Sequence, residues 1–463
     1  MNITVLNGSP KGSLSVTIQY VNFIQKKFPQ HELKVLNIAS QIKKIEKDAE
    51  AFQEILDQVG SSEGVLWAFP LYVFLVSSQY KRFIELLWEK KVEHVFKNKY
   101  TCVLTTSIHF FDHTAHNYMR AICDDLDMNF VGSFSAGMYD LLKEKERREL
   151  ITFAENFFQA IGTKTPTSKS FQPLTYRKFG YLPDDASGDA KDKIKTEKKI
   201  VVLTDGIDPR TNLGRMIEKL KSSFLKGIEV INLYDIDIKG GCLGCIQCGY
   251  DYECAYTDKD AFIDFYNTRL KTADVLIFAG MIQDRYLSSR WKLFFDRGFF
   301  NTHTPSFLGK QMGFIISGPL GQLSNLRQIL EGYVEWQQAN LVDFVTDEYG
   351  DSPQIDAALQ NLARRLVAFS EKDYIKPRTF LGVGGMKIFR DDIWGRLRFP
   401  FQADHRFYQN HGFYDFPQKD YKTRVMVTLL ILLSKIPNMR KEIYRKRMKE
   451  EMVKPLQKIL TKM

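Results

Sequence analysis

Four short apolar segments in the first part of the chain recur in the same order in the second part. Each segment is rich in β-branched residues and leads through a loop into a stretch with helical periodicity, which is the pattern of parallel βαβ units. The sequence therefore predicts an α/β protein with two tandem, doubly wound parallel sheets. The predicted strands, the first given with the loop that ends it, are 2–12, 32–38, 63–70 and 100–107 in the first copy and 198–206, 228–234, 274–280 and 311–318 in the second.

The spacing between the matching segments changes in one place. Val35 matches Val230 with an offset of 195 residues, whereas Lys81 matches Lys292 with an offset of 211. The second copy has therefore gained sixteen residues between its second and third strands. Four of the six cysteines lie in this interval, so we interpret them as a functional insertion into a fold that forms without them.

The organisation follows from this repeat and from composition. We expect a first domain over 1–161, a second over 199–372 and a mostly helical, basic extension over 373–463. The stretch 162–198, rich in Pro, Ser, Lys and Asp, is predicted to be a mostly solvated linker.

Charge and hydropathy limit the function classes. Residues 421–463 hold 12 Lys and Arg against 3 Asp and Glu, so nearly all of the net charge of +10 belongs to the C-terminal end. No aromatic and basic surface is evident, which argues against nucleic-acid binding. No segment is long and apolar enough to span a membrane, and the first residues lack the basic start of a signal peptide. Because the chain has too few cysteines for a disulfide-built scaffold, we expect it to be located in the reducing cytoplasm.

The first predicted strand ends in a loop suited to a phosphate. A strand-to-helix junction offers free backbone N–H groups at the positive end of a helix. The alternative is an ordinary turn with capping serines. The side chains that would surround a phosphate here are Ser9, Pro10, Lys11, Ser13, Ser15 and Thr17.

A second loop follows the third strand. Pro70, Leu71 and Tyr72 would lie at the carboxyl end of a central strand, where open α/β sheets bind ligands. Tyr72 could stack on a planar ring, or it could simply pack in the core. Ser107, at the end of the fourth strand, would reach the same crevice.

These loops, with the helix behind them, resemble the NADPH-dependent FMN reductase family of flavodoxin-like proteins. The family carries a Gly-Ser-Pro-(Arg/Lys) loop, a Pro-x-Tyr loop and a Lys-x-Phe helix, which match residues 8–11, 70–72 and 81–85. The resemblance covers about residues 1–160. It implies that FMN binds with its phosphate at the first loop and its ring beside the second, and that NAD(P)H is a possible electron donor.

The second copy departs from this pattern. Its first loop carries Asp205 and Asp208, which would repel a phosphate unless Arg210 or Arg215 compensates. Its third-strand loop lacks Pro-x-Tyr. We therefore expect one FMN per chain, bound in the first copy.

The four clustered cysteines are Cys242, Cys245, Cys248 and Cys254, with the spacing C-x2-C-x2-C-x5-C. Structural zinc usually takes two separated C-x2-C pairs, whereas a run of three suits an iron–sulfur cubane. Redox-active or idle thiols are the third alternative. Cys102 and Cys123 are expected to be plain buried thiols.

The cysteine motif and its position after the second strand resemble the iron–sulfur flavoproteins, a branch of the same superfamily. That resemblance implies a [4Fe–4S] cluster on these four residues. In these oligomeric proteins the cluster of one subunit lies near the FMN of another. We therefore hypothesise that the two copies form a pseudo-dimer, with FMN in the first copy beside the cluster of the second.

Other segments give weaker signals. His109, His113 and His116 would share a helix face beside the flavin, either hydrogen-bonded or, less favourably, as metal ligands. The aromatic stretch 380–417 is expected to be ordered and to cap the flavin crevice. The segment 424–452 fits a helical hairpin docked on the body, and a membrane surface is the less favoured alternative.

Together, these observations favour a flavoprotein oxidoreductase. It would pass electrons between a reduced donor, NAD(P)H or ferredoxin-like, and a small-molecule or protein redox partner through FMN and a [4Fe–4S] cluster. One alternative is an NAD(P)H-dependent FMN or quinone reductase without a cluster. Another is a non-catalytic scaffold with a structural zinc. No catalytic acid or base stands out, and the sequence leaves open whether two chains form a homo-oligomer.

Overall fold

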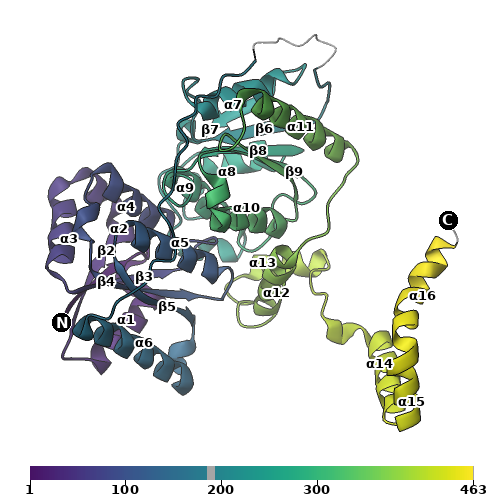
Figure 1. Cartoon of the computed structure of the whole chain (residues 1–463), viewed down its shortest axis with the longest axis horizontal. Helices are drawn as coiled ribbons and strands as arrows, with labels where there is room; N and C mark the ends of the chain where they lie inside the picture. The colour runs from purple at the N-terminus through teal and green to yellow at the C-terminus, as the bar shows by residue number, and fades with distance from the viewer. Residues whose placement is uncertain (185–192, 462–463) are drawn as a thin grey trace. The chain divides into compact units, whose positions relative to one another are not determined.

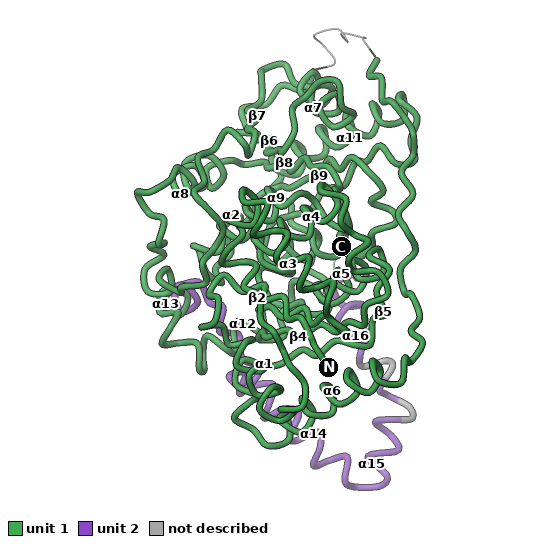
Figure 2. The backbone as a smooth tube through the Cα atoms, turned by 90° about the vertical axis from the view of Figure 1, so that its left-hand side faces the viewer, with its two compact units in different colours: residues 1–406 green, residues 407–463 purple. Residues whose placement is uncertain are grey.

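A computed structural model describes residues 1–184 and 193–461 of the chain. These residues form two compact units, residues 1–406 and residues 407–463 (Figure 2). Residues 185–192 of the predicted linker lie outside the described part. Within the first unit, we call residues 1–163 the first half and residues 200–371 the second half.

The first half is a parallel five-stranded sheet in the order β2-β1-β3-β4-β5 (Figure 1). Its central strands are almost wholly buried because helices cover both faces. The strands are β1 (Asn2–Asn7), β2 (Glu32–Asn37), β3 (Gly64–Pro70), β4 (Tyr100–Ser107) and β5 (Asn129–Gly137). The helices are α1 (Val16–Lys27), α2 (Ile38–Lys47), α3 (Ala49–Ser61), α4 (Ser78–Glu89), α5 (Asp112–Asp125) and α6 (Glu144–Thr163).

One core of the first half lies between the sheet and the helices α1 and α6. Helices α3, α4 and α5 lie on the opposite face, with α2 packed beside α4. This arrangement leaves the carboxyl ends of β1, β3 and β4 at one edge of the sheet, where the predicted phosphate and flavin loops emerge.

The second half repeats this topology, with the order β10-β9-β8-β6-β7. Helices α7 and α11 enclose its core on one face, and α9 and α10 lie on the other. The strands are β6 (Ile200–Thr204), β7 (Glu229–Asn232), β8 (Val275–Met281), β9 (Gln311–Ser317) and β10 (Asn340–Thr346). The helices are α7 (Asn212–Ser222), α8 (Phe262–Phe265), α9 (Ser289–Arg297), α10 (Ser324–Trp336) and α11 (Ser352–Glu371). The prediction of two doubly wound parallel sheets is confirmed.

The two halves meet through equivalent helices, α4 of the first and α9 of the second. The Glu85 carboxylate of α4 accepts a hydrogen bond of 2.6 Å from the backbone N–H of Ser289, the first residue of α9. Reciprocally, the Asp296 carboxylate of α9 accepts one of 2.6 Å from the backbone N–H of Ser78, the first residue of α4. Each half thus places a carboxylate on the helix N-terminus of the other, where negative charge is stabilised.

Both carboxylates are also paired with a buried lysine. Lys81 lies 2.7 Å from Glu85 and 2.9 Å from Asp284 of the second half. Lys292 forms an ion pair with Asp296. Only the Lys81–Asp284 pair crosses between the halves, whereas Lys81–Glu85 and Lys292–Asp296 lie within α4 and α9 and hold the two capping carboxylates in place.

The chain between the halves is mostly exposed, but it is hydrogen-bonded to both halves, for example from the Ser170 N–H to Asp124 and from the Leu182 N–H to Ser352. Tyr181 is fully buried, and its hydroxyl donates a hydrogen bond to Asp356 of α11. After α11, helix α12 (Phe380–Trp394) packs on α10, and α13 (Gln402–Asn410) follows.

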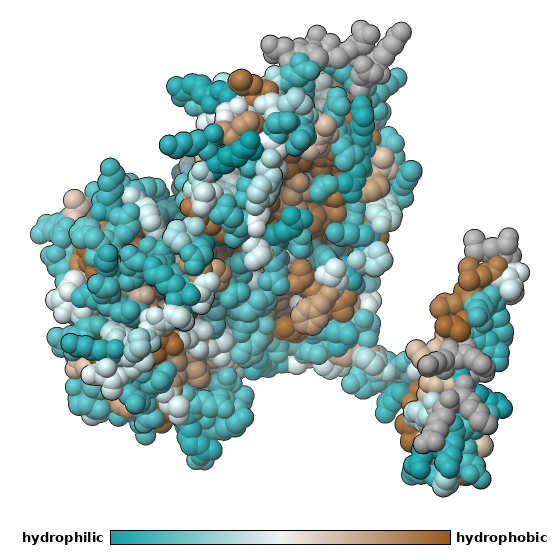
Figure 3. Space-filling view, in the orientation of Figure 1, coloured by the Kyte–Doolittle hydropathy of each residue, from teal (hydrophilic) through white to brown (hydrophobic). Residues whose placement is uncertain are grey.

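The second unit is helical, as predicted for the C-terminal extension. Its helices are α14 (Tyr421–Ser434), α15 (Pro437–Lys441) and α16 (Met448–Leu460). No residue of α14 is buried, although most of its side chains are apolar, and apolar surface of this unit is visible in Figure 3. Among the helices that the structure describes, none has the length and hydropathy needed to cross a membrane.

Candidate functional site

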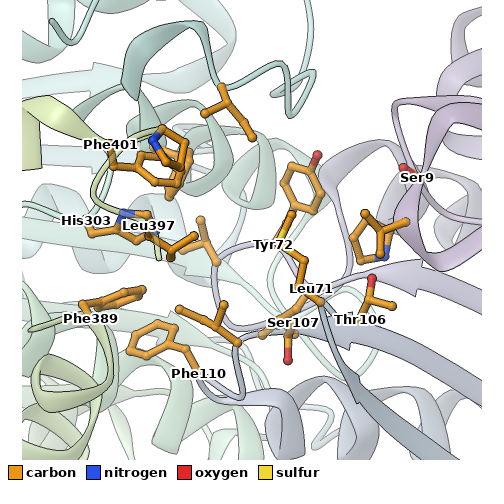
Figure 4. Close-up of a pocket in the computed structure, with 18 of the residues that line it drawn as sticks. Ser9, Leu71, Tyr72, Thr106, Ser107, Phe110, His303, Phe389, Leu397 and Phe401 are labelled. Atoms are coloured by element: carbon orange, nitrogen blue, oxygen red, sulfur yellow. The ribbon is translucent and has the colours of Figure 1, made fainter. Parts of the chain in front are cut away.

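A pocket of about 400 Å³ opens at the carboxyl ends of β1, β3 and β4 (Figure 4). This volume lies in the range of small-molecule and cofactor sites. One wall is formed by loops of the first half. The opposite wall comes from the second half and from the segment around α12. The residues predicted from sequence that line the pocket are Ser9, Lys11, Ser15, Pro70, Leu71, Tyr72 and Ser107.

The loop after β1 is held in a compact turn by the buried side chain of Asn7. Its amide oxygen accepts a hydrogen bond of 3.0 Å from Ser9 N–H, and its amide nitrogen donates one of 3.0 Å to the Gly12 carbonyl. Ser15 then caps α1 by accepting a hydrogen bond from Thr17 N–H. The loop therefore presents serine hydroxyls and a helix N-terminus to the pocket, an arrangement that suits an anion.

Three predicted binding residues lie outside the lining of this pocket. Pro10 faces a neighbouring groove between the halves. Ser13 is exposed on the turn before α1. Thr17 is buried, and its hydroxyl lies 2.6 Å from that of Thr106. A role for these three in cofactor binding stays a prediction.

Tyr72 stands at the base of a tight turn. Its backbone N–H and C=O each form a hydrogen bond of 2.8 Å with Leu75. The two residues between them, Val73 and Phe74, have φ values of 27° and 67°, which are costly for side chains of this size. The Lys292 ammonium donates a hydrogen bond of 3.1 Å to the Tyr72 carbonyl. The α4–α9 interface therefore supports this strained turn directly.

The phenol of Tyr72 is kept protonated. Burial raises its pKa well above the usual value, and nearby Cys242, Asp296 and Cys245 raise it further. A neutral aromatic ring at this position can stack on a planar ligand.

Two of the three predicted histidines form local hydrogen bonds. His109 lies before α5, with φ of 63°, so the three do not share one helix face. Its Nδ1 lies 3.0 Å from Asp112, and His116 Nε2 lies 2.7 Å from the Thr105 hydroxyl. The hydrogen-bonded interpretation of these histidines is thus supported.

These environments predict opposite pKa shifts for two imidazoles. The hydrogen bond to Asp112 raises the pKa of His109, whereas burial lowers that of His116. The His109–Asp112 pair should stabilise the fold below pH ~6.5 and lose this effect as pH rises through the raised pKa of His109. NMR titration should give a His109 pKa above that of His116. In Asp112→Asn, the His109 pKa should fall toward the ordinary value. An unchanged His109 pKa in this variant would contradict the assignment.

The cysteine loop lies against the first-half wall of the pocket. Ile246, between the second and third cysteines of the motif, lines the pocket. A Cβ atom on Gly244 would lie 2.0 Å from the Tyr72 hydroxyl and 3.0 Å from Cε of Lys11. Gln79 of α4 donates a hydrogen bond of 3.1 Å to the Cys242 carbonyl. The insertion of the second half therefore lies against both the loop that carries Tyr72 and the loop that carries Lys11.

The backbone of this loop is strained where it meets the pocket. Gly244 and Ile246 both have φ of 63°, a region that β-branched residues rarely adopt. Arg297 fixes the base of the loop, because its guanidinium forms hydrogen bonds of 2.6 and 2.9 Å with Asp260 and one of 3.0 Å with the Gly240 carbonyl. Such a buried bidentate pair gives the loop a defined position.

The four thiols are grouped but do not form a closed ligand set. Burial raises the pKa of Cys242 to about 12. The hydrogen bond from the Gly244 N–H lowers this pKa, whereas Asp296, Cys254 and Cys245 raise it further. Burial and the other three thiols likewise raise the pKa of Cys248. None of the four is in a disulfide. In the described part of the chain, no three or more His, Cys, Asp or Glu side chains are arranged to hold a metal ion.

The sequence predicted only part of the far wall of the pocket. The aromatic stretch around α12 was expected to cap the flavin crevice, and Phe389, Leu397 and Phe401 line this pocket. His303 and Trp336 of the second half also line this wall, and nothing in their sequence context indicated it.

The equivalent crevice of the second half is small and acidic. It measures about 160 Å³ and is lined in part by Tyr176, Arg177 and Phe179 of the inter-half segment. Asp347 also lines it and accepts hydrogen bonds of 2.8 Å from Asn212 and from the Gly318 N–H. A flavin phosphate would meet negative charge there.

Comparisons with known proteins agree with the first-half site. Residues 1–139 match the family model of NADPH-dependent FMN reductases. No curated protein sequence matches the chain. Among solved structures, the apo form of the NADH:FMN oxidoreductase EMOB is 16% identical, covering 34% of this chain and 89% of its own, with a TM-score of 0.31. The NAD(P)H:(acceptor) oxidoreductase FerB from Paracoccus denitrificans is also 16% identical, covering 35% and 97%, with a TM-score of 0.30. Residues 1–139 are thus similar to NADPH-dependent FMN reductases.

Proposed function

We propose that this chain is an FMN-dependent oxidoreductase that passes electrons from a reduced donor to an acceptor through FMN in the first half and a [4Fe–4S] cluster on the second-half cysteine loop. The observation that carries the proposal is the pocket itself. Loops within the family-matched residues form one side of it, and the cysteine loop lies against that side.

The residues present fit FMN. The Ser9–Ser15 turn and the N-terminus of α1 would hold the phosphate, and Tyr72 would lie beside the ring. FMN supplies hydride acceptance and single-electron release when bound. The chain's own contribution is to position the ring, to exclude water with the apolar far wall and to keep the Tyr72 phenol protonated. NAD(P)H is the proposed donor, and a ferredoxin-like protein is the alternative.

The proposal of a [4Fe–4S] cluster is based on the chemistry and the position of the four cysteine thiols. Cys242, Cys245, Cys248 and Cys254 supply four soft ligands on one glycine-rich loop. The Sγ of Cys242 accepts a hydrogen bond of 3.4 Å from Gly244 N–H, the kind of contact that tunes cluster thiolates. The contact of this loop with Tyr72 and Lys11 supports the pseudo-dimer hypothesis, in which flavin and cluster are neighbours.

The second candidate is an NAD(P)H-dependent FMN or quinone reductase without a cluster. It is favoured by the open arrangement of the thiols, since no metal-ligand group is formed in the described residues. In both candidates we propose one FMN per chain, because the second-half crevice is small and acidic.

The electron acceptor, the location in the cell and the interaction partners of the chain are also proposals. The acceptor would be a small molecule or a protein redox partner, and the chain would work in the reducing cytoplasm. The exposed apolar helix α14 and the basic residues of 421–463 also fit an anionic membrane surface, as an alternative to a helical hairpin docked on the body. A homo-oligomer is compatible with the pseudo-dimer.

Anaerobic purification followed by flavin, iron, sulfide and zinc analysis tests the proposal. We expect one FMN per chain and iron with sulfide in equal amounts. Yellow protein without iron would support the cluster-free reductase. Colourless protein that contains zinc and binds no added FMN would refute an FMN oxidoreductase and support a zinc scaffold.

A further inference from the structure

A buried histidine–aspartate pair forms part of the pocket wall opposite the phosphate loop. His303 Nδ1 lies 2.7 Å from Asp404 Oδ2, and the Asp404 side chain is fully buried. His303 lines the pocket, as Figure 4 shows on the side away from Ser9. The pair joins the second half to α13, so neither the first half nor the family-matched residues contain it.

The position of the imidazole is fixed by its surroundings. The ring of His303 packs between the rings of Phe389 and Phe401, each with its centroid 4.5 Å away. Asp404 in turn accepts hydrogen bonds from the Thr302 hydroxyl and, at 3.2 Å, from the His303 N–H. A carboxylate held in this way fixes the orientation of the imidazole.

The wall around this imidazole selects for a particular ligand chemistry. Phe110, Phe389, Leu397 and Phe401 make it apolar and largely aromatic. With the phosphate at Ser9 and the flavin ring beside Tyr72, this wall is the part of the pocket left for the electron acceptor. An apolar wall favours a flat, conjugated acceptor over a sugar or a charged metabolite.

We propose that His303, oriented by Asp404, is the proton donor to an electron acceptor bound against this aromatic wall. This inference rests on the flavin part of the proposed function, since the acceptor would take its electrons directly from reduced flavin and not through the cluster. With FMN bound and reduced by NAD(P)H, the flavin would supply a hydride to the acceptor, and His303 Nε2 would supply the proton to its carbonyl oxygen. A quinone thereby becomes a hydroquinone, and His303 regains its proton from water. Asp404 is a positioning residue.

Comparing the rates with two electron acceptors distinguishes proton donation by His303 from a general effect on the flavin. A benzoquinone takes two electrons with protons, whereas ferricyanide takes one electron and no proton. In His303→Gln, we expect the rate with benzoquinone to fall about 100-fold, the usual worth of a general acid, and the rate with ferricyanide to be unchanged. His405→Gln, a buried neighbour on α13 that does not line the pocket, is the matched control and should leave both rates unchanged.

The solvent deuterium isotope effect provides a second readout, which does not depend on a variant folding well. It should be present with benzoquinone in the wild type and absent with ferricyanide. Asp404→Asn should lower kcat for benzoquinone more than it raises KM. Added imidazole should partly restore benzoquinone reduction in His303→Ala.

The outcomes are distinguishable. If the wild-type chain binds flavin and reduces ferricyanide, but His303→Gln slows both acceptors equally or neither, the proton-donor role is wrong and the proposed function stands. A wild-type solvent isotope effect that is equal for both acceptors would also overturn the role. If the wild-type chain binds no flavin and reduces neither acceptor, the proposed function itself fails.

Discussion

Replacing Lys292 with methionine is expected to lower the free energy of unfolding by about 3–5 kcal/mol, the usual cost of leaving a buried charge without its partner. Lys292 and Asp296 are both fully buried, and the Asp296 carboxylate also accepts a hydrogen bond from the N–H of Ser78 at the start of α4. Burial already raises the pKa of Asp296. Without Lys292, its carboxyl should be protonated at neutral pH, and the packing of α4 against α9 should loosen.

The same substitution should weaken FMN binding, because Lys292 also holds the Tyr72 carbonyl of the flavin turn. Urea unfolding and flavin retention on gel filtration measure the two effects. The double variant Lys292→Met, Asp296→Asn removes the buried charge and keeps an acceptor for Ser78, so it should recover most of the stability. Arg148→Met breaks an exposed pair with Glu144 and should cost well under 1 kcal/mol. A Lys292→Met variant as stable as Arg148→Met would show that the pair does not hold the halves together.

Replacing Cys242 with serine is expected to remove the iron and sulfide of anaerobically purified protein while leaving FMN bound. A serine hydroxyl is a much poorer ligand for iron than a thiolate, so one iron of the cubane would lose its protein ligand and the cluster would be destabilised. Cys242 is also the cysteine tied most directly to the first half, through Gln79. Its loss should therefore also slow electron transfer to a one-electron protein acceptor.

Cys123→Ala is the matched control, since Cys123 is a fully buried thiol on α5, outside the loop. This variant should keep both iron and FMN. Iron that persists in Cys242→Ser, or that is lost in Cys123→Ala, would contradict the assignment of ligands. Flavin lost together with iron in Cys242→Ser would mean that the loop is needed to build the flavin pocket.

Much of the fold could be predicted because buried parallel strands give continuous apolar runs. The predicted strand 100–107 coincides with β4, and 63–70 differs from β3 by one residue. The edge strands β5 and β10 were not predicted. β5 is only partly buried and contains Gly and Ser, so its sequence lacks the continuous apolar run of a central strand.

Only those site residues that lie together in a short loop could be predicted from the sequence. Ser9 and Tyr72 lie in short loops whose residue types indicate a ligand, and both line the pocket. His303 and Asp404 are about one hundred residues apart in sequence and come together through tertiary packing, which leaves no periodicity or spacing to detect. The reciprocal caps between Glu85 and Ser289 depend on tertiary packing in the same way.

A crystal structure of the anaerobically purified chain, with anomalous data collected at the iron edge, tests the central claim most directly. The account predicts one FMN, with its phosphate at the Ser9–Ser15 turn and its ring beside Tyr72. It also predicts iron density at the Sγ atoms of the loop that carries Ile246 into the same pocket. A flavin bound in the second half, or iron far from the flavin, would contradict it.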